Sequence, residues 1–137
     1  MNIGLGDQRK TILLIDADPH ARAVLRGALE AASFSVGEAA NNREGERTIL
    51  RVKPDAILAD LLAETADTGT TISEWLQANG SPTPCYIVST AAEALMGSVG
   101  LHELGITGVF LKPVDTALVI QTLRTQLGVG SSGPRHA

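Results

Sequence analysis

The stretch Thr11-Ile-Leu-Leu-Ile-Asp-Ala-Asp-Pro19 sets the start of the predicted fold. Its apolar run, residues 11–15, is short and rich in β-branched side chains, which is typical of a strand buried on both faces. Asp18 can cap the helix that follows, and Pro19 suits the first helical position because it has no N–H to leave unpaired. Apolar side chains then recur at helical spacing to about Ala32. The stretch therefore predicts a strand, an acidic turn and a helix.

The same alternation continues along the chain. Further strands are expected at residues 34–39, where Gly37 interrupts the pattern, and at 55–59, 84–89 and 107–111. Further helices are expected after Asn41, around Trp75, over 91–104, and from Asp115 to Leu127. Five strands that alternate with five helices predict the α/β class, with a doubly wound parallel sheet and helices on both faces.

Composition narrows the class of protein. The net charge is −4, and the 11 lysines and arginines are scattered, so direct binding to nucleic acid is not expected. Cys85 is the single cysteine, which excludes an internal disulfide and fits a reducing compartment. The N-terminus lacks the apolar core of a signal peptide, and no apolar run approaches the ~20 residues of a membrane helix. We therefore expect a cytoplasmic protein that does not contact the membrane.

Polar side chains follow four of the expected strands. They are Asp16, Asp60, Ser89 and Lys112. Because parallel strands end at one edge of a sheet, these groups are expected to lie together, where such sheets bind ligands. A carboxylate can attack phosphorus, while a cation and a hydroxyl bind the oxygens on which charge accumulates. The pattern predicts chemistry on a phosphoryl group.

Four motifs in order resemble the receiver domain of response regulators. They are Ile12-Leu-Leu-Ile-Asp-Ala-Asp-Pro19, Pro54-Asp-Ala-Ile-Leu-Ala-Asp-Leu61, Pro84-Cys-Tyr-Ile-Val-Ser89 and Val109-Phe-Leu-Lys-Pro113. The resemblance implies a flavodoxin-like (βα)5 sheet with strand order 2-1-3-4-5. It also implies a receiver domain over 10–127, between an N-terminal tail at 1–9 and a flexible C-terminal tail at 128–137.

The same resemblance implies a role for each site residue. Asp60 would accept phosphate from a histidine kinase, a phosphotransfer protein or a small phosphodonor, with Ser89 and Lys112 on the phosphoryl oxygens. Asp16, Asp60 and the backbone carbonyl of Leu62 would hold Mg²⁺. Lys112-Pro113 would be a cis peptide bond. With no output domain expected after the last helix, signalling would pass to a downstream protein partner. The face of the last strand and its neighbouring helices could also form a homodimer. The domain would not be an enzyme.

Three positions depart from the family pattern. Receivers usually carry a second acid where this chain has Ala17, so binding of Mg²⁺ and phosphorylation are expected to be weakened. The loop after Asp60 has Glu64-Thr65 in place of Pro-Gly. The aromatic switch position is Val109, and Phe110, one place later, is expected to face the other side of the sheet. Output would then not use rotation of an aromatic ring.

Three other functions remain open at this point. One is a receiver that binds partners without being phosphorylated, which Ala17 favours. Another is a phosphohydrolase of the haloacid-dehalogenase type, which also places Asp-x-Asp after its first strand. That family needs a further acidic motif after the lysine, where only Asp115 remains, and it leaves Asp60 unexplained. A flavodoxin-like cofactor binder fits less well, since acids follow the first strand in place of a glycine-rich phosphate loop.

Overall fold

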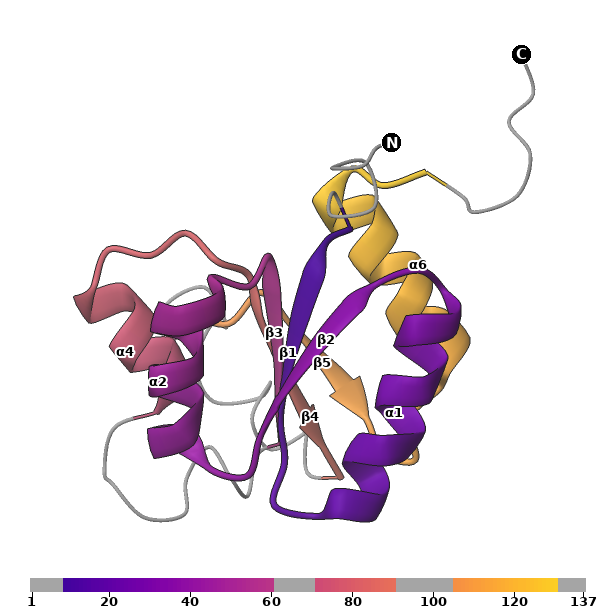
Figure 1. The fold of residues 1–137 in the computed structure, drawn as a ribbon, viewed down its shortest axis with the longest axis horizontal. Helices are drawn as coiled ribbons and strands as arrows, with labels where there is room; N and C mark the ends of the chain where they lie inside the picture. Colours follow the sequence, from indigo (N-terminus) through magenta and orange to yellow (C-terminus); the bar gives the residue numbers. More distant parts are fainter. Residues whose placement is uncertain (1–8, 61–70, 91–104, 131–137) are drawn as a thin grey trace.

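The computed structural model describes residues 9–60, 71–90 and 105–130. The elements in these ranges are β1 (Thr11–Ile15), α1 (Pro19–Ala31), β2 (Ser35–Ala39), α2 (Asn42–Val52), β3 (Ala56–Asp60), α4 (Ile72–Ala78), β4 (Cys85–Ser89), β5 (Gly108–Leu111) and α6 (Thr116–Leu127) (Figure 1). The helix expected over 91–104 lies outside the described residues. Elsewhere the observed strands and helices fall within one or two residues of the expected ones.

The five strands form one parallel sheet in the order β2-β1-β3-β4-β5, which confirms the predicted topology. Strand β2 is at one edge and β5 at the other. The predicted interruption at Gly37 is wrong, because Gly37 pairs in register with Leu13 and β2 runs unbroken to Ala39. A glycine lowers the strand propensity of a sequence, but here the pairing with β1 outweighs that preference.

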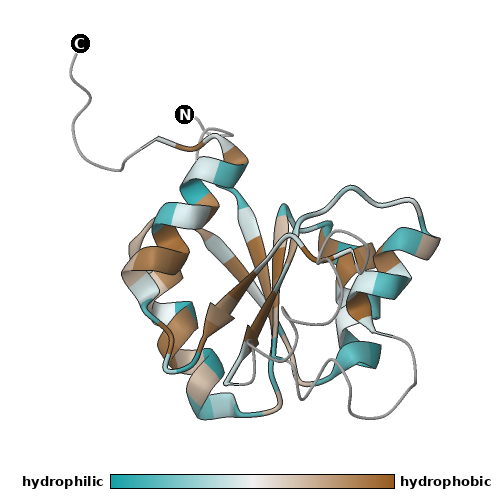
Figure 2. Cartoon of the chain, turned by 180° about the vertical axis from the view of Figure 1, so that it is seen from behind, coloured by the Kyte–Doolittle hydropathy of each residue, from teal (hydrophilic) through white to brown (hydrophobic). Residues whose placement is uncertain are grey.

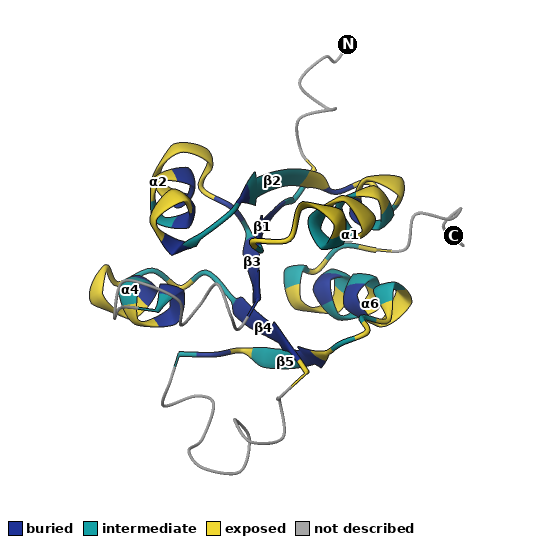
Figure 3. Cartoon of the chain, turned by 90° about the horizontal axis from the view of Figure 1, so that it is seen from below, coloured by how far each residue is buried: buried dark blue, intermediate teal, exposed yellow. Residues whose placement is uncertain are grey.

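Helices cover both faces of the sheet, α1 and α6 on one side and α2 and α4 on the other (Figure 3). Alternate strand residues therefore enter two separate cores. Leu13, Ile15 and Ile57 pack toward Ile49 of α2 and Ile72 of α4. The other core holds Ile12, Leu14, Leu58, Leu29, Val119 and Leu123. Much of the inner strands is brown in Figure 2, because side chains on both of their faces are apolar.

Local capping groups begin the helices where the sequence predicted. Asp18 accepts a hydrogen bond from the backbone N–H of His20 at 2.9 Å, and Asn41 accepts one from Glu44 at 2.9 Å. Asp115 caps α6 through the N–H of Leu118 at 3.2 Å. Thr71 and Glu74 form a reciprocal capping box at the start of α4. These caps satisfy N–H groups that a helix start would otherwise leave unpaired.

The sheet brings the carboxyl ends of its strands to one rim. Asp60 is the last residue of β3, not the residue after it as predicted, and its register partner is Val88. Ser89, one residue further along β4, is paired with Leu111 of β5. Asp16 follows β1 directly, and Lys112 follows β5. The peptide bond between Lys112 and Pro113 is cis, as predicted.

The last helix ends at Leu127, where Gly128 adopts a left-handed conformation with φ of 69°. This conformation suits glycine, which has no β-carbon to clash. This end agrees with the helix end expected at Leu127, and residues 131–137 lie outside the described part of the chain. Among the helices described, none combines the length and apolar character that a membrane span requires.

We predict that Gly45→Ala destabilises the protein. A β-carbon at position 45 would lie 2.6 Å from Cδ1 of Ile15, which is buried in the core and has no free space to enter. Overpacking of this kind costs about 1–3 kcal/mol, against a gain of about 1 kcal/mol in helix propensity. We expect urea denaturation to show a net loss of about 1 kcal/mol in the free energy of unfolding.

Gly27→Ala is the matched control, since it makes the same substitution on α1. A β-carbon there would have no other heavy atom within 4 Å, among those the structure describes. This variant should gain up to about 1 kcal/mol from helix propensity. Equal effects of the two substitutions would contradict the proposed contact between α2 and β1.

Candidate functional site

Three strand ends place charged side chains in contact. The ammonium of Lys112 donates a hydrogen bond to Oδ1 of Asp60, and the same nitrogen lies 3.9 Å from Oδ2 of Asp16. The side chain of Asp60 is only 6% exposed, that of Asp16 17%, and that of Lys112 30%. Two carboxylates from different strands therefore share one cation at the rim of the sheet.

Asp16 is held by backbone hydrogen bonds on both sides. Its N–H donates to the carbonyl of Ala39 at 3.0 Å, which extends the pairing between β1 and β2 by one residue. Its Oδ1 accepts from the N–H of Asp18 at 2.8 Å. Because the carboxylate of Asp18 caps α1, the interpretation of Asp18 as a structural residue agrees with the structure. These bonds orient Asp16 toward the rim.

Arg22 is a site residue that sequence reasoning missed. Its Nη1 donates to the backbone carbonyl of Asp16, and its Nε forms an ion pair with Glu38 of β2 at 2.9 Å. Glu38 also pairs with Arg26, and the hydrogen bonds from Arg22 and Arg26 hold the pKa of Glu38 below its ordinary value. A cation in the first turns of a helix is electrostatically unfavourable, and that was the signal available in the sequence.

Burial and charge shift the pKa values at the rim. Burial raises the pKa of Asp16; the hydrogen bond from Asp18 opposes this rise, and the charge of Asp60 adds to it. Burial alone would lower the pKa of Lys112. The hydrogen bond and charge of Asp60, helped by Asp16, outweigh burial and raise that pKa. Lys112 therefore stays protonated, and it offsets the repulsion between the two carboxylates.

The rim opens into a cleft of about 370 Å³ between α1 and the connection from β5 to α6. Its polar end contains Asp16, Asp60 and Lys112. Its apolar wall includes Val24 and Leu25 of α1. The sequence did not predict this wall, because the two helices that enclose the cleft are more than 80 residues apart in the chain. The cleft therefore combines a charged end with an apolar wall.

Two other expected site residues are Ser89 and Leu62. Ser89 is buried at the same rim, but it lies one residue past Val88, which is the register partner of Asp60. Because side chains alternate along a strand, the β-carbon of Ser89 lies on the face of the sheet that α2 and α4 cover. The β-carbon of Asp60 lies on the face that α1 covers. Leu62, expected to supply a carbonyl ligand, lies outside the described residues, as does Glu64.

The switch position before Lys112 also follows the alternation of β5. Val109 packs against the core under α2 and α4, whereas Phe110 belongs to the core under α1 and α6. The ring of Phe110 stacks on that of Tyr86, with 5.3 Å between centroids. The predicted opposite orientation of Phe110 is confirmed. The aromatic ring is therefore a core residue on the far side of the sheet from Val109.

The oxygen ligands at the rim suit a hard divalent cation, which they would bind with modest affinity. Asp16 and Asp60 offer carboxylate oxygens, the ligands that Mg²⁺ prefers, and Mg²⁺ commonly binds one or two carboxylates while keeping several waters. Ala17 is exposed beside them and offers no donor. In the described ranges, no group of three or more His, Cys, Asp or Glu side chains gathers as a metal site. The set fits Mg²⁺ with two protein carboxylates.

Comparison with known proteins identifies what this arrangement is similar to. The chain matches the response regulator receiver domain over residues 12–124. The chemotaxis response regulator CheY4 of Vibrio cholerae superposes with a TM-score of 0.70 at 22% identity, covering 86% of this chain and 98% of that one. The receiver domain of NtrX from Brucella abortus gives 0.74 at 16% identity, covering 87% and 99%. The receiver domain of the Francisella response regulator 1452 gives 0.75 at 17% identity, covering 88% and 98%.

We predict that Asp16 makes stability depend on pH in a defined direction. A carboxyl whose pKa is raised on folding binds its proton more tightly in the folded state, so the free energy of unfolding falls as pH rises through the raised pKa. Between the ordinary pKa and the raised pKa of Asp16, the wild type should therefore lose stability relative to Asp16→Asn as the pH rises, since asparagine never becomes charged. Below the ordinary value of 3.8 the difference should no longer change with pH. Urea midpoints of both proteins between about pH 3 and 7 measure it. Parallel curves would show that burial of Asp16 is not costly.

Proposed function

The chain belongs to the family of response regulator receiver domains, and on that premise we propose that Asp60 accepts a phosphoryl group. Receiver domains are signalling modules of two-component systems, and in general they are not enzymes. The proposal makes this chain a phosphorylated switch whose output passes through contacts with other proteins. Whether the acceptor works is a separate question from the fold, because function depends on the site and not on the architecture.

The observation that carries the proposal is the shared ammonium of Lys112. It neutralises Asp60 before reaction, and it lies where the oxygens of an incoming phosphoryl group would gather. Asp60 is almost fully buried, so it meets only groups that enter the cleft beside α1. A cation held by two carboxylates can bind a new anion without moving far.

The chemical step forms one bond and breaks another. A carboxylate oxygen of Asp60 bonds to phosphorus, and the bond from phosphorus to the donor breaks with its electron pair on the leaving group. The product is an acyl phosphate, and the leaving imidazole or carboxylate carries away the electron pair. Lys112 would then pair with the phosphoryl oxygens, and the hydroxyl of Ser89 would donate a hydrogen bond to one of them.

Mg²⁺ is the metal that this reaction would use. Asp16 and Asp60 would hold it, with the carbonyl of Leu62 as the further expected ligand. When bound, the ion neutralises charge on the phosphoryl oxygens. Arg22 keeps the backbone of Asp16 in place, and Lys112 competes for the same carboxylates. With Ala17 in place of an acid, the affinity for Mg²⁺ would be lower than in receivers with two adjacent acids.

The partners follow from the proposed switch. Receiver domains interact with histidine kinases and with downstream effectors, and this chain would receive its phosphate from a kinase, a phosphotransfer protein or a small phosphodonor. Leu111 of β5 and Leu118 of α6 are exposed large apolar side chains on neighbouring elements. They would serve as the output face, toward a downstream protein or a second copy of the chain.

A second candidate function is that of an interaction module that works without phosphorylation. Ala17 is the observation that favours it, because the loss of one carboxylate removes a negative charge from the metal site. On this alternative, Asp60 and Lys112 would act as a structural ion pair. The same experiment distinguishes the two functions.

Intact-mass analysis tests the acceptor directly. With Mg²⁺ and acetyl phosphate, we expect the wild type to gain the mass of one phosphoryl group, because Asp60 is the nucleophile. Asp60→Asn should gain none. Asp18→Asn is the matched control: it lies in the same cleft, keeps a capping oxygen for α1, and should still form the adduct.

Two results would contradict the phosphoacceptor proposal. One is a wild type that forms no adduct with acetyl phosphate and does not bind beryllofluoride, a result that would favour the interaction module. The other is an adduct that persists in Asp60→Asn, which would place the modification on another residue. Circular dichroism of each variant checks that the fold is retained.

We further predict that Ala17→Asp strengthens the site. The new carboxylate would restore an acid at an exposed position beside Asp16. Calorimetric titration should show at least about a tenfold gain in Mg²⁺ affinity, since loss of even an outer partner of a metal ligand commonly costs that much. The rate of adduct formation from acetyl phosphate should rise with it. Ala17→Asn is the control, because it adds an oxygen without charge and should give a smaller gain. Unchanged affinity in Ala17→Asp would show that Ala17 is not a defect in the site.

A further inference from the structure

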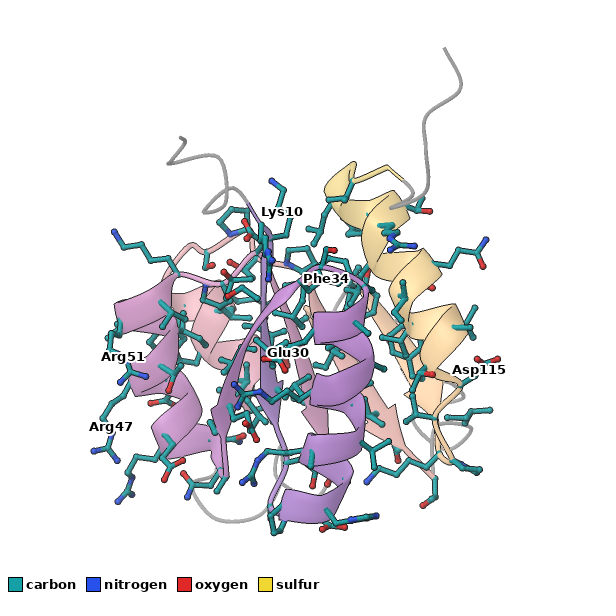
Figure 4. All side chains as sticks on the ribbon, turned by 45° about the vertical axis from the view of Figure 1, so that its right-hand side comes forward. Lys10, Glu30, Phe34, Arg47, Arg51 and Asp115 are labelled. Carbon is teal, nitrogen blue, oxygen red and sulfur yellow. The ribbon has the colours of Figure 1, made fainter. Side chains whose placement is uncertain are left out.

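The outer side of α2 carries a row of three arginines beside an exposed leucine. Arg43, Arg47 and Arg51 are exposed and spaced by four residues, so they lie along one side of the helix. Leu50 lies between the last two, and its 67% exposure is the highest among the large apolar side chains described as exposed. We call these four residues the α2 basic surface. Figure 4 shows Arg47 and Arg51 extending outward, away from the sheet.

These arginines lack acidic partners among the described residues. Each ion pair found there uses Arg22, Arg26 or Lys112. Helix α2 also carries two acids, Glu44 and Glu46. Glu44 accepts a hydrogen bond from the backbone N–H of Ala40 at 2.9 Å, and no ion pair within the described ranges joins either glutamate to the arginines. The three arginines are therefore without an ion-pair partner in the described part of the chain, although the net charge of the whole chain is −4.

Folding does not require the α2 basic surface. The helix is secured by the Asn41 cap and by Gly45 and Ile49, which are buried against the sheet. Like charges four residues apart destabilise a helix slightly, and a cation in its first turn opposes the helix dipole, as Arg43 does. Glu44 in the first turn and Arg51 in the last turn complement the dipole and offset this cost, so the stability of the helix does not account for the row of three exposed arginines.

We propose that the α2 basic surface binds an acidic helical segment of a partner protein. Three arginines on one side of a helix complement acids at the same spacing on a second helix, and Leu50 supplies an apolar contact between them. Protein interfaces are enriched in arginine around apolar contacts. Proteins that bind nucleic acid or anionic membranes usually have basic domains. This chain is acidic, with a pI of about 5.3, so a protein partner fits it better.

The surface is separate from the proposed phosphorylation site. The cleft at Asp60 is lined by α1 and by the start of α6, whereas α2 covers the opposite face of the sheet (Figure 3). The chain would therefore bind two partners on different sides. Binding at α2 requires neither Mg²⁺ nor phosphate, so its test is independent of the acceptor.

Fluorescence anisotropy with a designed peptide tests this proposal. The probe is a labelled helical peptide with glutamates at i, i+4 and i+8 and a leucine beside them. We expect Arg47→Glu combined with Arg51→Glu to weaken binding at least about tenfold, and Leu50→Ser to weaken it several-fold. A peptide with lysines in place of the glutamates should prefer the charge-reversed protein.

Arg9→Glu with Lys10→Glu is the matched control, since it changes the net charge by the same amount. Lys10 directly precedes β1, and Figure 4 shows it well away from Arg47 and Arg51. The control should keep the affinity of the wild type. Equal weakening in the control, or no binding of the peptide to the wild type, would overturn the proposal. Tighter binding of duplex DNA or phosphatidylglycerol vesicles, dependent on the arginines but not on Leu50, would also overturn it in favour of a general polyanion surface.

Discussion

The ammonium of Lys112 makes it possible for two carboxylates from different strands to lie together at a partly buried rim. Asp60 at the end of β3 and Asp16 after β1 would repel each other, and burial already raises the pKa of Asp16. Lys112 pairs with both because β5 ends at the same edge of the sheet. The parallel register is thus the constraint behind the site: it sets where each strand stops and which charges meet there.

This charge balance also limits the chemistry of the rim. The cluster of Asp16, Asp60 and Lys112 has a net charge of one negative unit at neutral pH, and Ala17 adds none. A divalent cation must therefore compete with an ammonium for two carboxylates, whereas a second acid at position 17 would favour the metal. Arg22 acts on the backbone of Asp16 and not on its carboxylate, so it orients the ligand without neutralising it.

The two faces of the sheet differ in the residues that they bury and expose. The α1 and α6 side encloses the cleft at Asp60 and the stacked rings of Phe110 and Tyr86. The α2 and α4 side contains Val109 in its core and presents Arg43, Arg47 and Arg51 to solvent. Alternate residues of each strand enter opposite cores, so the strands that carry the rim residues contribute to both helix layers.

The sequence alone determined the class of fold, the strand order and the residues that end the strands. Those features depend on local periodicity, on caps such as Asp18 and Asn41, and on motifs whose order resembles one family. Only the tertiary structure decided that Arg22 binds the carbonyl of Asp16 and Glu38 of β2, and that Ser89 lies one residue past the partner of Asp60. Periods of 2 and 3.6 residues specify which side a residue faces within its own element. Register and packing between distant elements decide which groups meet, and no local pattern encodes them.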